Sequence, residues 1–255
     1  MAQLLRGSLW IGRFLGVRVG IHPSWLPIFA LVVWAIAGSF SDLDAANALL
    51  LATVTALAFF ASVVIHEFAH ALVARRYGVG TLAIRLFLFG GVATIASEPP
   101  TPGAEAAIAV AGPLCSLVLA ALCGAGVEAL RAFGGEPHAA LVLISLAAAN
   151  AFLALFNLLP AFPMDGGRLL RALLWHLGGD RRAATRLASV VGLSLAAVLG
   201  LAGVGLAWRT HQWESLWYVA LAGFVSVAAM HSYQEARRGG VVAECPPAGG
   251  SEGAR

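Results

Sequence analysis

The segment NLLPAFPMDGGRLLRALL, residues 157–174, ends a long apolar run of the kind that spans a membrane. A spanning helix needs no Pro, Gly or Asp, and an unpartnered carboxylate at membrane depth is costly. The two prolines stop the run from continuing as an ideal helix, and the two glycines permit a turn after it. Because irregular backbone at this depth is tolerated only where it lines a cavity, the segment predicts an internal site toward which Asp165 is aimed.

The composition is typical of a chain that lies in a lipid bilayer. Hydrophobic residues make up 60% of the 255 residues and charged residues only 11%, whereas soluble domains carry about 25% charged residues. A helix needs about 20 mostly apolar residues to cross a bilayer, and six stretches qualify. These stretches cover residues 23–40, 48–74, 105–130, 139–159, 187–208 and 214–232. The sequence therefore predicts an all-α polytopic membrane protein with about six transmembrane helices.

One long stretch between the predicted spans, residues 77–103, is too apolar for a free loop. Gly90 and Gly91 in its middle indicate a hairpin turn. We expect a membrane-associated β-hairpin or a re-entrant element there, shielded by protein. The Gly/Pro-rich residues 239–255 predict a disordered cytoplasmic tail after a membrane-embedded domain over residues 1–238.

The basic residues indicate the orientation of the chain in the membrane. All 16 are Arg, and 14 of them precede the first predicted span or fall in the loops and tail of that same side. Only Arg131 and Arg209 lie on the other side. The positive-inside rule then predicts a multi-pass protein of the cell membrane with both termini in the cytoplasm. Because the arginines flank apolar segments instead of forming a basic stripe, no nucleic-acid partner is expected.

A second polar cluster occurs inside the second predicted span, in VVIHEFAH, residues 63–70. His66 and His70 are four residues apart and share one helix face, so both rings can reach one metal ion. Glu67 is then placed to take a proton from a water that the metal activates. The alternative is a set of polar contacts between helices, with Glu67 paired to an arginine. Ionisable groups rarely cluster at membrane depth without function, which favours the metal site.

A catalytic zinc site needs a third protein ligand and an open fourth position. Asp165 is the candidate, because the predicted orientation brings the ends of the second and fourth spans to the same side. Asn157 lies eight residues before it and could hydrogen-bond a substrate carbonyl or a developing oxyanion. For Asn157 alone, an interhelical hydrogen bond is the simpler interpretation.

Together, HEFAH and NLLPAFPMDGGR resemble the two signatures of the site-2 protease family of intramembrane zinc metalloproteases. FGGVATI resembles the membrane-associated hairpin of that family, and AGPLCSLVLAAL resembles its Gly-Pro helix start. The resemblance implies one Zn²⁺ per chain, with His66, His70 and Asp165 as its ligands. It also implies that Glu67 is the catalytic base and that Asn157 polarises the substrate. The six-span branch fits best, and we expect neither a PDZ domain nor the C-terminal CBS pair of many relatives.

The leading hypothesis is thus a metalloprotease that cleaves a transmembrane segment of a single-span membrane protein near the cytoplasmic face. The predicted hairpin, with Gly90 and Gly91, would bind an extended substrate by strand addition. The alternative is a metal or proton transporter that uses the same His/Asp cluster. Two features count against a transporter, since the two motifs do not repeat each other and transport needs no Glu67. A catalytically dead scaffold is disfavoured by the intact Glu67, and homo-oligomerisation stays open.

Overall fold

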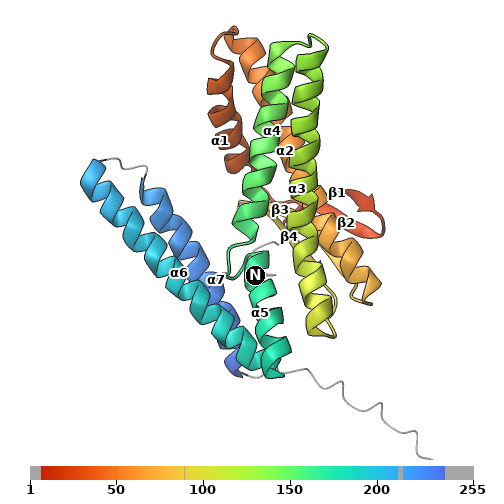
Figure 1. Cartoon of the computed structure of the whole chain (residues 1–255), viewed down its shortest axis with the longest axis vertical. Coiled ribbons are helices and arrows are strands. Elements are labelled where there is room, and N and C mark those ends of the chain that lie inside the picture. Colours follow the sequence, from red (N-terminus) through yellow and green to blue (C-terminus); the bar gives the residue numbers. More distant parts are fainter. Residues whose placement is uncertain (1–6, 89, 212–214, 239–255) are drawn as a thin grey trace, which may run out of the picture.

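The computed structural model describes residues 7–88, 90–211 and 215–238. Within these ranges, five helices are long and apolar enough to cross a membrane. They are α2 (Ala45–Arg76), α3 (Pro102–Ala132), α4 (Pro137–Asn157), α6 (Arg181–Thr210) and α7 (Leu216–Arg238). A shorter apolar helix, α1 (Trp25–Ala37), continues into the 3₁₀ turn η1 (Gly38–Phe40). Figure 1 shows α1 to α4 standing together as a bundle, whereas α6 and α7 form a hairpin that leans away from it.

All six predicted spans coincide with helices, but the first is shorter than a span. The 13 residues of α1 and the 3 of η1 extend about 24 Å, which is less than the roughly 30 Å of a hydrocarbon core. Five helices are therefore long enough to cross a membrane, whereas α1 together with η1 is long enough for only part of its thickness. The predicted disordered tail, residues 239–255, lies outside the described residues.

Side-chain caps explain where α2, α3 and α4 begin. Asp44 accepts hydrogen bonds from the backbone N–H groups of Ala46 and Asn47 at the start of α2. Thr101 and Glu136 do the same for α3 and α4, and each is followed by a proline at the first helical position. These caps satisfy backbone donors that have no partner inside the helix. The polar residues Asp44, Thr101 and Glu136 therefore determine where these three helices begin.

The described residues also form a four-stranded sheet in the order β1-β2-β3-β4. Its strands are β1 (Leu9–Phe14), β2 (Val17–Ile21), β3 (Thr81–Phe87) and β4 (Gly90–Ile95). The pair β3–β4 confirms the predicted hairpin, but the position of its turn was wrong. Phe87 pairs with Gly90 and Leu86 with Gly91, so both glycines belong to β4. Strands β1 and β2 were not predicted, and β2 joins β3 in parallel.

The segment 157–174 is resolved into a helix end, a loop and a new helix. Helix α4 ends at Asn157, and α5 (Asp165–Gly178) begins at the aspartate. The two glycines were expected to permit a turn, and this was wrong, because both lie in the first turn of α5. A Cβ atom on Gly166 would lie 2.1 Å from the carbonyl oxygen of Leu158, and one on Gly167 would lie 2.6 Å from the carbonyl carbon of Ala161. The glycines thus allow α5 to pack directly on the loop before it.

The α6–α7 hairpin packs on the same loop. Ala161 and Met164 contact a cluster that includes Ala196 of α6 and Val225 of α7. Phe162 packs against a second pair of small residues, one from each of the two helices. The loop that precedes Asp165 is therefore held between α5 and the α6–α7 hairpin.

At the opposite end of the bundle, His138 joins two connections. Its Nε2 atom lies 2.9 Å from Oδ2 of Asp42, in the connection between α1 and α2. Its Nδ1 atom lies 2.5 Å from Oε1 of Glu136, the cap of α4. These hydrogen bonds lower the pKa of the Asp42 carboxyl and of the Glu136 carboxyl. They hold the start of α4 beside the far end of α1.

A buried ion pair joins α3 to α5. Glu105, in the first turns of α3, is completely buried. One of its carboxylate oxygens accepts hydrogen bonds from Nε and Nη2 of Arg171 on α5. Arg181, the first residue of α6, lies 3.9 Å from the other oxygen. Two arginines from successive helices thus converge on one carboxylate.

We expect Glu105→Gln to lower thermal stability in detergent by the amount typical of a broken buried ion pair. Such a change leaves a buried arginine uncompensated, which costs about 3–5 kcal/mol. The matched control is Glu128→Gln, which removes the exposed pair with Arg131 and should cost about 0–1 kcal/mol. Equal melting temperatures for the two variants would contradict a stabilising role for the buried pair.

Candidate active site

Helices α2 and α5 bring three potential metal ligands together. His66 and His70 lie one turn apart on α2, and Asp165 is the first residue of α5. All three are buried. The Nε2 atoms of the two histidines are 3.2 Å apart. Oδ2 of Asp165 lies 3.1 Å from Nε2 of His70 and 3.4 Å from Nε2 of His66. The structure therefore brings together the three residues that the sequence predicted as ligands.

Helix α3 holds the far side of both imidazole rings. Nδ1 of His70 lies 2.6 Å from the carbonyl oxygen of Ile108, which can only accept, so this nitrogen carries the proton. Nδ1 of His66 lies 2.9 Å from Oγ of Ser116. In the neutral ring of His70 the lone pair is then on Nε2, where it faces the carboxylate. Backbone and hydroxyl partners of this kind orient metal-binding histidines.

The three converging atoms fit a zinc ion. Zinc binds imidazole nitrogen and carboxylate oxygen at about 2.0–2.2 Å in a tetrahedral arrangement. Two ligands of such a tetrahedron are about 3.3 Å apart, and the three separations here are 3.1, 3.2 and 3.4 Å. Lone pairs at these distances repel one another unless a metal ion or a proton on one imidazole lies between them. The chemistry of the donor set and its spacing therefore both suit Zn²⁺, with one coordination position left for water or substrate.

The candidate base and the candidate polarising residue lie where two cavities adjoin. Glu67, Asn157 and Gly91 line both of them. One cavity, of about 290 Å³, includes His70 and Asp165. The other, of about 540 Å³, is mainly apolar. Glu67 and Asn157 thus lie between the His66/His70/Asp165 cluster and an apolar cavity.

Gly91 has a steric reason to be glycine. A Cβ atom there would lie 2.7 Å from Cγ of Glu67, so a larger residue would displace the carboxylate. Asn157 ends α4 and its amide donates to the carbonyl of Leu153, 2.9 Å away, within its own helix. The interhelical bond considered from the sequence is thus replaced by a bond inside α4. Arg168, which lines the smaller cavity, has its Nη1 atom 3.8 Å from Oδ1 of Asp165.

The sequence matches Peptidase family M50 over residues 54–134 and 128–199, which together exceed half of the chain. The chain belongs to this family. The matched residues include His66, Glu67, His70 and Asp165, and they extend from α2 into α6. The resemblance to site-2 proteases that the two motifs indicated is confirmed.

Individual relatives agree with this assignment. The chain is 43% identical over 208 residues to a Mycobacterium tuberculosis protein assigned as the zinc metalloprotease Rip3. It is 32% identical over 200 residues to a zinc metalloprotease of Methanocaldococcus jannaschii. These alignments cover 78% and 77% of this chain but 52% and 54% of the relatives, so the chain spans about half the length of the curated relatives it matches. The solved structure of a site-2 protease from Methanocaldococcus jannaschii is 28% identical with a TM-score of 0.61, over 89% of this chain and 95% of that structure.

In this family member, α3 contributes more to the site than the sequence revealed. The Gly-Pro pair was interpreted as a helix start, and this was wrong, because α3 begins at Pro102 and contains Gly112 and Pro113 in its interior. A Cβ atom on Gly112 would lie 2.2 Å from Nε2 of His70 and 2.5 Å from Nε2 of His66. A glycine beside a proline inside an apolar run was the only available signal. Neither Ser116 nor the Ile108 carbonyl could be assigned from the sequence.

Gly112→Ala is expected to lower the zinc content of the purified protein well below one ion per chain. Its methyl group would occupy the space between the two Nε2 atoms and push the imidazoles apart. The matched control is Gly124→Ala in the same helix, where an added Cβ would meet nothing within 4 Å. Elemental analysis of both variants beside the parent provides the measurement. Full zinc occupancy in Gly112→Ala would contradict the proposed position of the ion.

Proposed function

We propose that this chain is an intramembrane zinc metalloprotease that cleaves a transmembrane segment of another membrane protein. The observation that carries the proposal is the position of Glu67. This carboxylate adjoins the His66/His70/Asp165 cluster and also lines an apolar cavity. A hydrolase needs a base at such a boundary, whereas a metal or proton path needs only the cluster.

Each residue has a role in this proposal. His66, His70 and Asp165 would hold the ion, which supplies an acidified water and polarises a peptide carbonyl. Glu67 would accept the proton of the attacking water and pass it to the leaving amine. Asn157 would donate its amide to the substrate carbonyl, which requires it to exchange its present bond to Leu153.

The larger cavity supports access for an apolar substrate. Its walls come from α1, α2, α4, α7 and the β3–β4 hairpin, and include Pro27, Leu31, Phe152, Phe156, Trp217 and Leu221. In Figure 1, α7 and α4 diverge from the region of α5, so the α6–α7 hairpin and the bundle lie apart along most of their length. A transmembrane segment of a single-span protein is the substrate that this apolar lining suits.

Strand β4 is the proposed docking edge for the scissile segment. Among the described strands it pairs only with β3, so its other edge is open to strand addition. Gly90 and Gly91 line the larger cavity at the start of this strand. A substrate paired there would be extended, which exposes carbonyl groups that a helix keeps bonded.

We also propose that the site faces the cytoplasm and that both termini lie on that side. The ends of α2, α4 and α7 and the starts of α3 and α6 lie at the same end of the fold as Asp165. Of the arginines that the structure describes, all but Arg131 and Arg209 belong to that end. The positive-inside rule supports this orientation.

The orientation predicts that reporter fusions at Arg238 and at Glu136 report opposite sides of the membrane. Arg238 ends α7, and Glu136 caps α4 at the other end of the bundle. A phosphatase reporter, active outside, and a fluorescent reporter, active inside, provide complementary readings at each position. The same side for both fusions would refute the three crossings, α4, α6 and α7, that separate the two positions.

The variant Glu67→Gln separates a protease from a transporter. It keeps the three ligands and the volume of the side chain, so zinc content should stay near one ion per chain. Loss of a general base lowers the rate by about 10²–10⁴-fold or more, so cleavage of a single-span substrate in detergent should fall by at least that factor.

The control for this test is Glu98→Gln, an acid at the end of the sheet that pairs with Arg181 away from the ligands. It should cleave at the parental rate. If Glu67→Gln with full zinc cleaves as fast as the parent, Glu67 is not the base and the protease mechanism fails. Metal flux that persists in a variant without cleavage would instead favour transport.

A further inference from the structure

The sheet has two chemically different faces. Ile21 and Leu86 pack toward α2 in a cluster with Phe60, and Val17 lines a cavity together with Phe68 of that helix. The side chains of the alternate positions point the other way. Register places Arg13 opposite Arg18 on β1 and β2, and Gly20 opposite both Trp10 and Arg85. Paired positions share a face, so three arginines and Trp10 occupy the face turned away from α2.

This arginine face, defined as Arg13, Arg18, Arg85 and the indole of Trp10, has unbalanced positive charge. Like charges directly opposite one another destabilise an antiparallel pair, and Arg13 and Arg18 are such a pair. The guanidinium carbons of Arg18 and Arg85 lie 4.8 and 5.0 Å from the centre of the Trp10 ring. Nε of Arg85 is buried and has no hydrogen-bond partner among the described residues. Three cations gathered in this way lack an anion.

The sequence around the arginine face supplies no such anion. Residues 7–41 and 71–97, which contain all four strands and the end of α2, include no Asp or Glu. Arg75 and Arg76 at the end of α2 are also exposed and add to the positive charge. Among the described residues, no ion pair joins a carboxylate to Arg13, Arg18 or Arg85, so an anionic ligand would supply the missing counter-charge.

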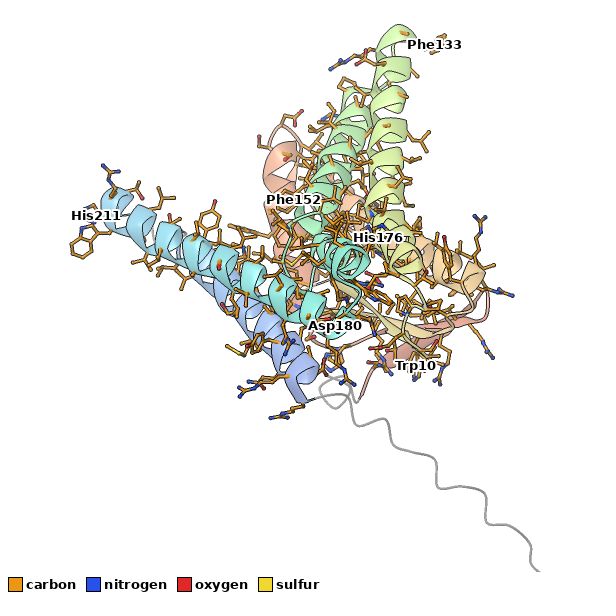
Figure 2. All side chains as sticks on the ribbon, turned by 60° about the horizontal axis from the view of Figure 1, so that its bottom comes forward. Trp10, Phe133, Phe152, His176, Asp180 and His211 are labelled. Atoms are coloured by element: carbon orange, nitrogen blue, oxygen red, sulfur yellow. The ribbon has the colours of Figure 1, made fainter. Side chains whose placement is uncertain are left out.

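The edge strand β1 is apolar and exposed on the other face of the sheet, because Leu9 lies opposite Ile21 and Phe14 lies opposite Val17. Leu9, Ile11, Phe14 and Leu15 are between 52% and 72% exposed. In Figure 2, Trp10 lies at the edge of the sheet on the side away from the α6–α7 hairpin. An exposed apolar strand edge in water invites aggregation, whereas at the level of lipid headgroups it contacts acyl chains. Cations beside apolar side chains match the boundary between headgroups and hydrocarbon.

We propose that the arginine face binds the phosphates of anionic phospholipids in the leaflet next to the metal site. The exposed residues of β1 insert beside the acyl chains, and the guanidinium groups take the headgroup phosphates. Arginine suits this role because its planar fork pairs with phosphate oxygens at two points. A soluble acidic protein would satisfy the charge but would leave Leu9 and Leu15 exposed to water. The inference concerns lipid binding and does not depend on the proposed protease activity.

The test is a titration of the purified protein with phosphatidylglycerol or phosphatidylcholine, read as bound lipid by native mass spectrometry. The parent should prefer phosphatidylglycerol. Arg13→Gln, Arg18→Gln and Arg85→Gln combined should weaken that binding by about fivefold per arginine, and roughly a hundredfold in total. The control combines Arg182→Gln, Arg186→Gln and Arg237→Gln, three exposed arginines of α6 and α7. It removes the same charge and should keep the bound phosphatidylglycerol.

A thermal-shift measurement adds an independent reading, since a ligand that binds only the folded state raises the melting temperature. Phosphatidylglycerol should raise it in the parent and the control, and much less in the sheet variant. If the triple variant does not fold, Arg13→Gln and Arg85→Gln singly should each lose about fivefold. Equal losses in the sheet variant and the control, or no preference for phosphatidylglycerol in the parent, would overturn the proposal. Displacement of the lipid by inorganic phosphate at constant ionic strength would also overturn it, in favour of a free-anion site.

Discussion

The convergence of three lone-pair atoms in an apolar interior is the constraint on which the rest of the structure depends. Two imidazole nitrogens and a carboxylate oxygen within 3.1–3.4 Å of one another repel unless a metal ion or a shared proton lies among them. The histidines come from the second half of α2 and the aspartate from the start of α5, and His70 and Asp165 are 95 residues apart in sequence. The chain must therefore bring two distant segments to one point at membrane depth and satisfy every other polar atom nearby.

Helix α3 meets this constraint through its backbone as much as through its side chains. Ile108 and Ser116 fix the rings of the two histidines, and Gly112 between them leaves room for the ion. One turn before Ile108, Glu105 holds Arg171 and so ties α5 to the same helix. Both α2 and α5 thus contact the same helix, α3. Because the interior is closely packed, the position of α3 fixes the positions of His66, His70 and Asp165. The glycines of α5 serve the same end by letting its first turn rest on the loop.

The sequence predicted the parts of this site that depend on local spacing. His66 and His70 share a face by helical periodicity alone, and the cost of a carboxylate in an apolar region singled out Asp165. Contacts between distant segments could not be predicted in this way. A pair of glycines such as Gly166 and Gly167 is compatible with a turn and also with close packing of two backbone segments. Only the observed approach of α5 to Leu158 and Ala161 shows that close packing is the reason here. Strands β1 and β2 escaped prediction because Gly and Arg interrupt their apolar alternation, and because β3, the parallel partner of β2, lies about 65 residues away.

The two unpredicted strands explain how β4 can leave an edge open beside Glu67. A two-stranded hairpin is marginal by itself, whereas a larger sheet with one face packed on a helix is stable. Strands β1 and β2 extend the β3–β4 hairpin to four strands, and their buried face rests on α2, the helix that carries Glu67. Strands β1 and β2 thereby stabilise the sheet on the side away from the cavity. Strand β4 can therefore stay ordered with β3 as its neighbour on one side alone. Its free backbone groups are then available to an extended segment, while the opposite edge of the sheet, at β1, meets the lipid.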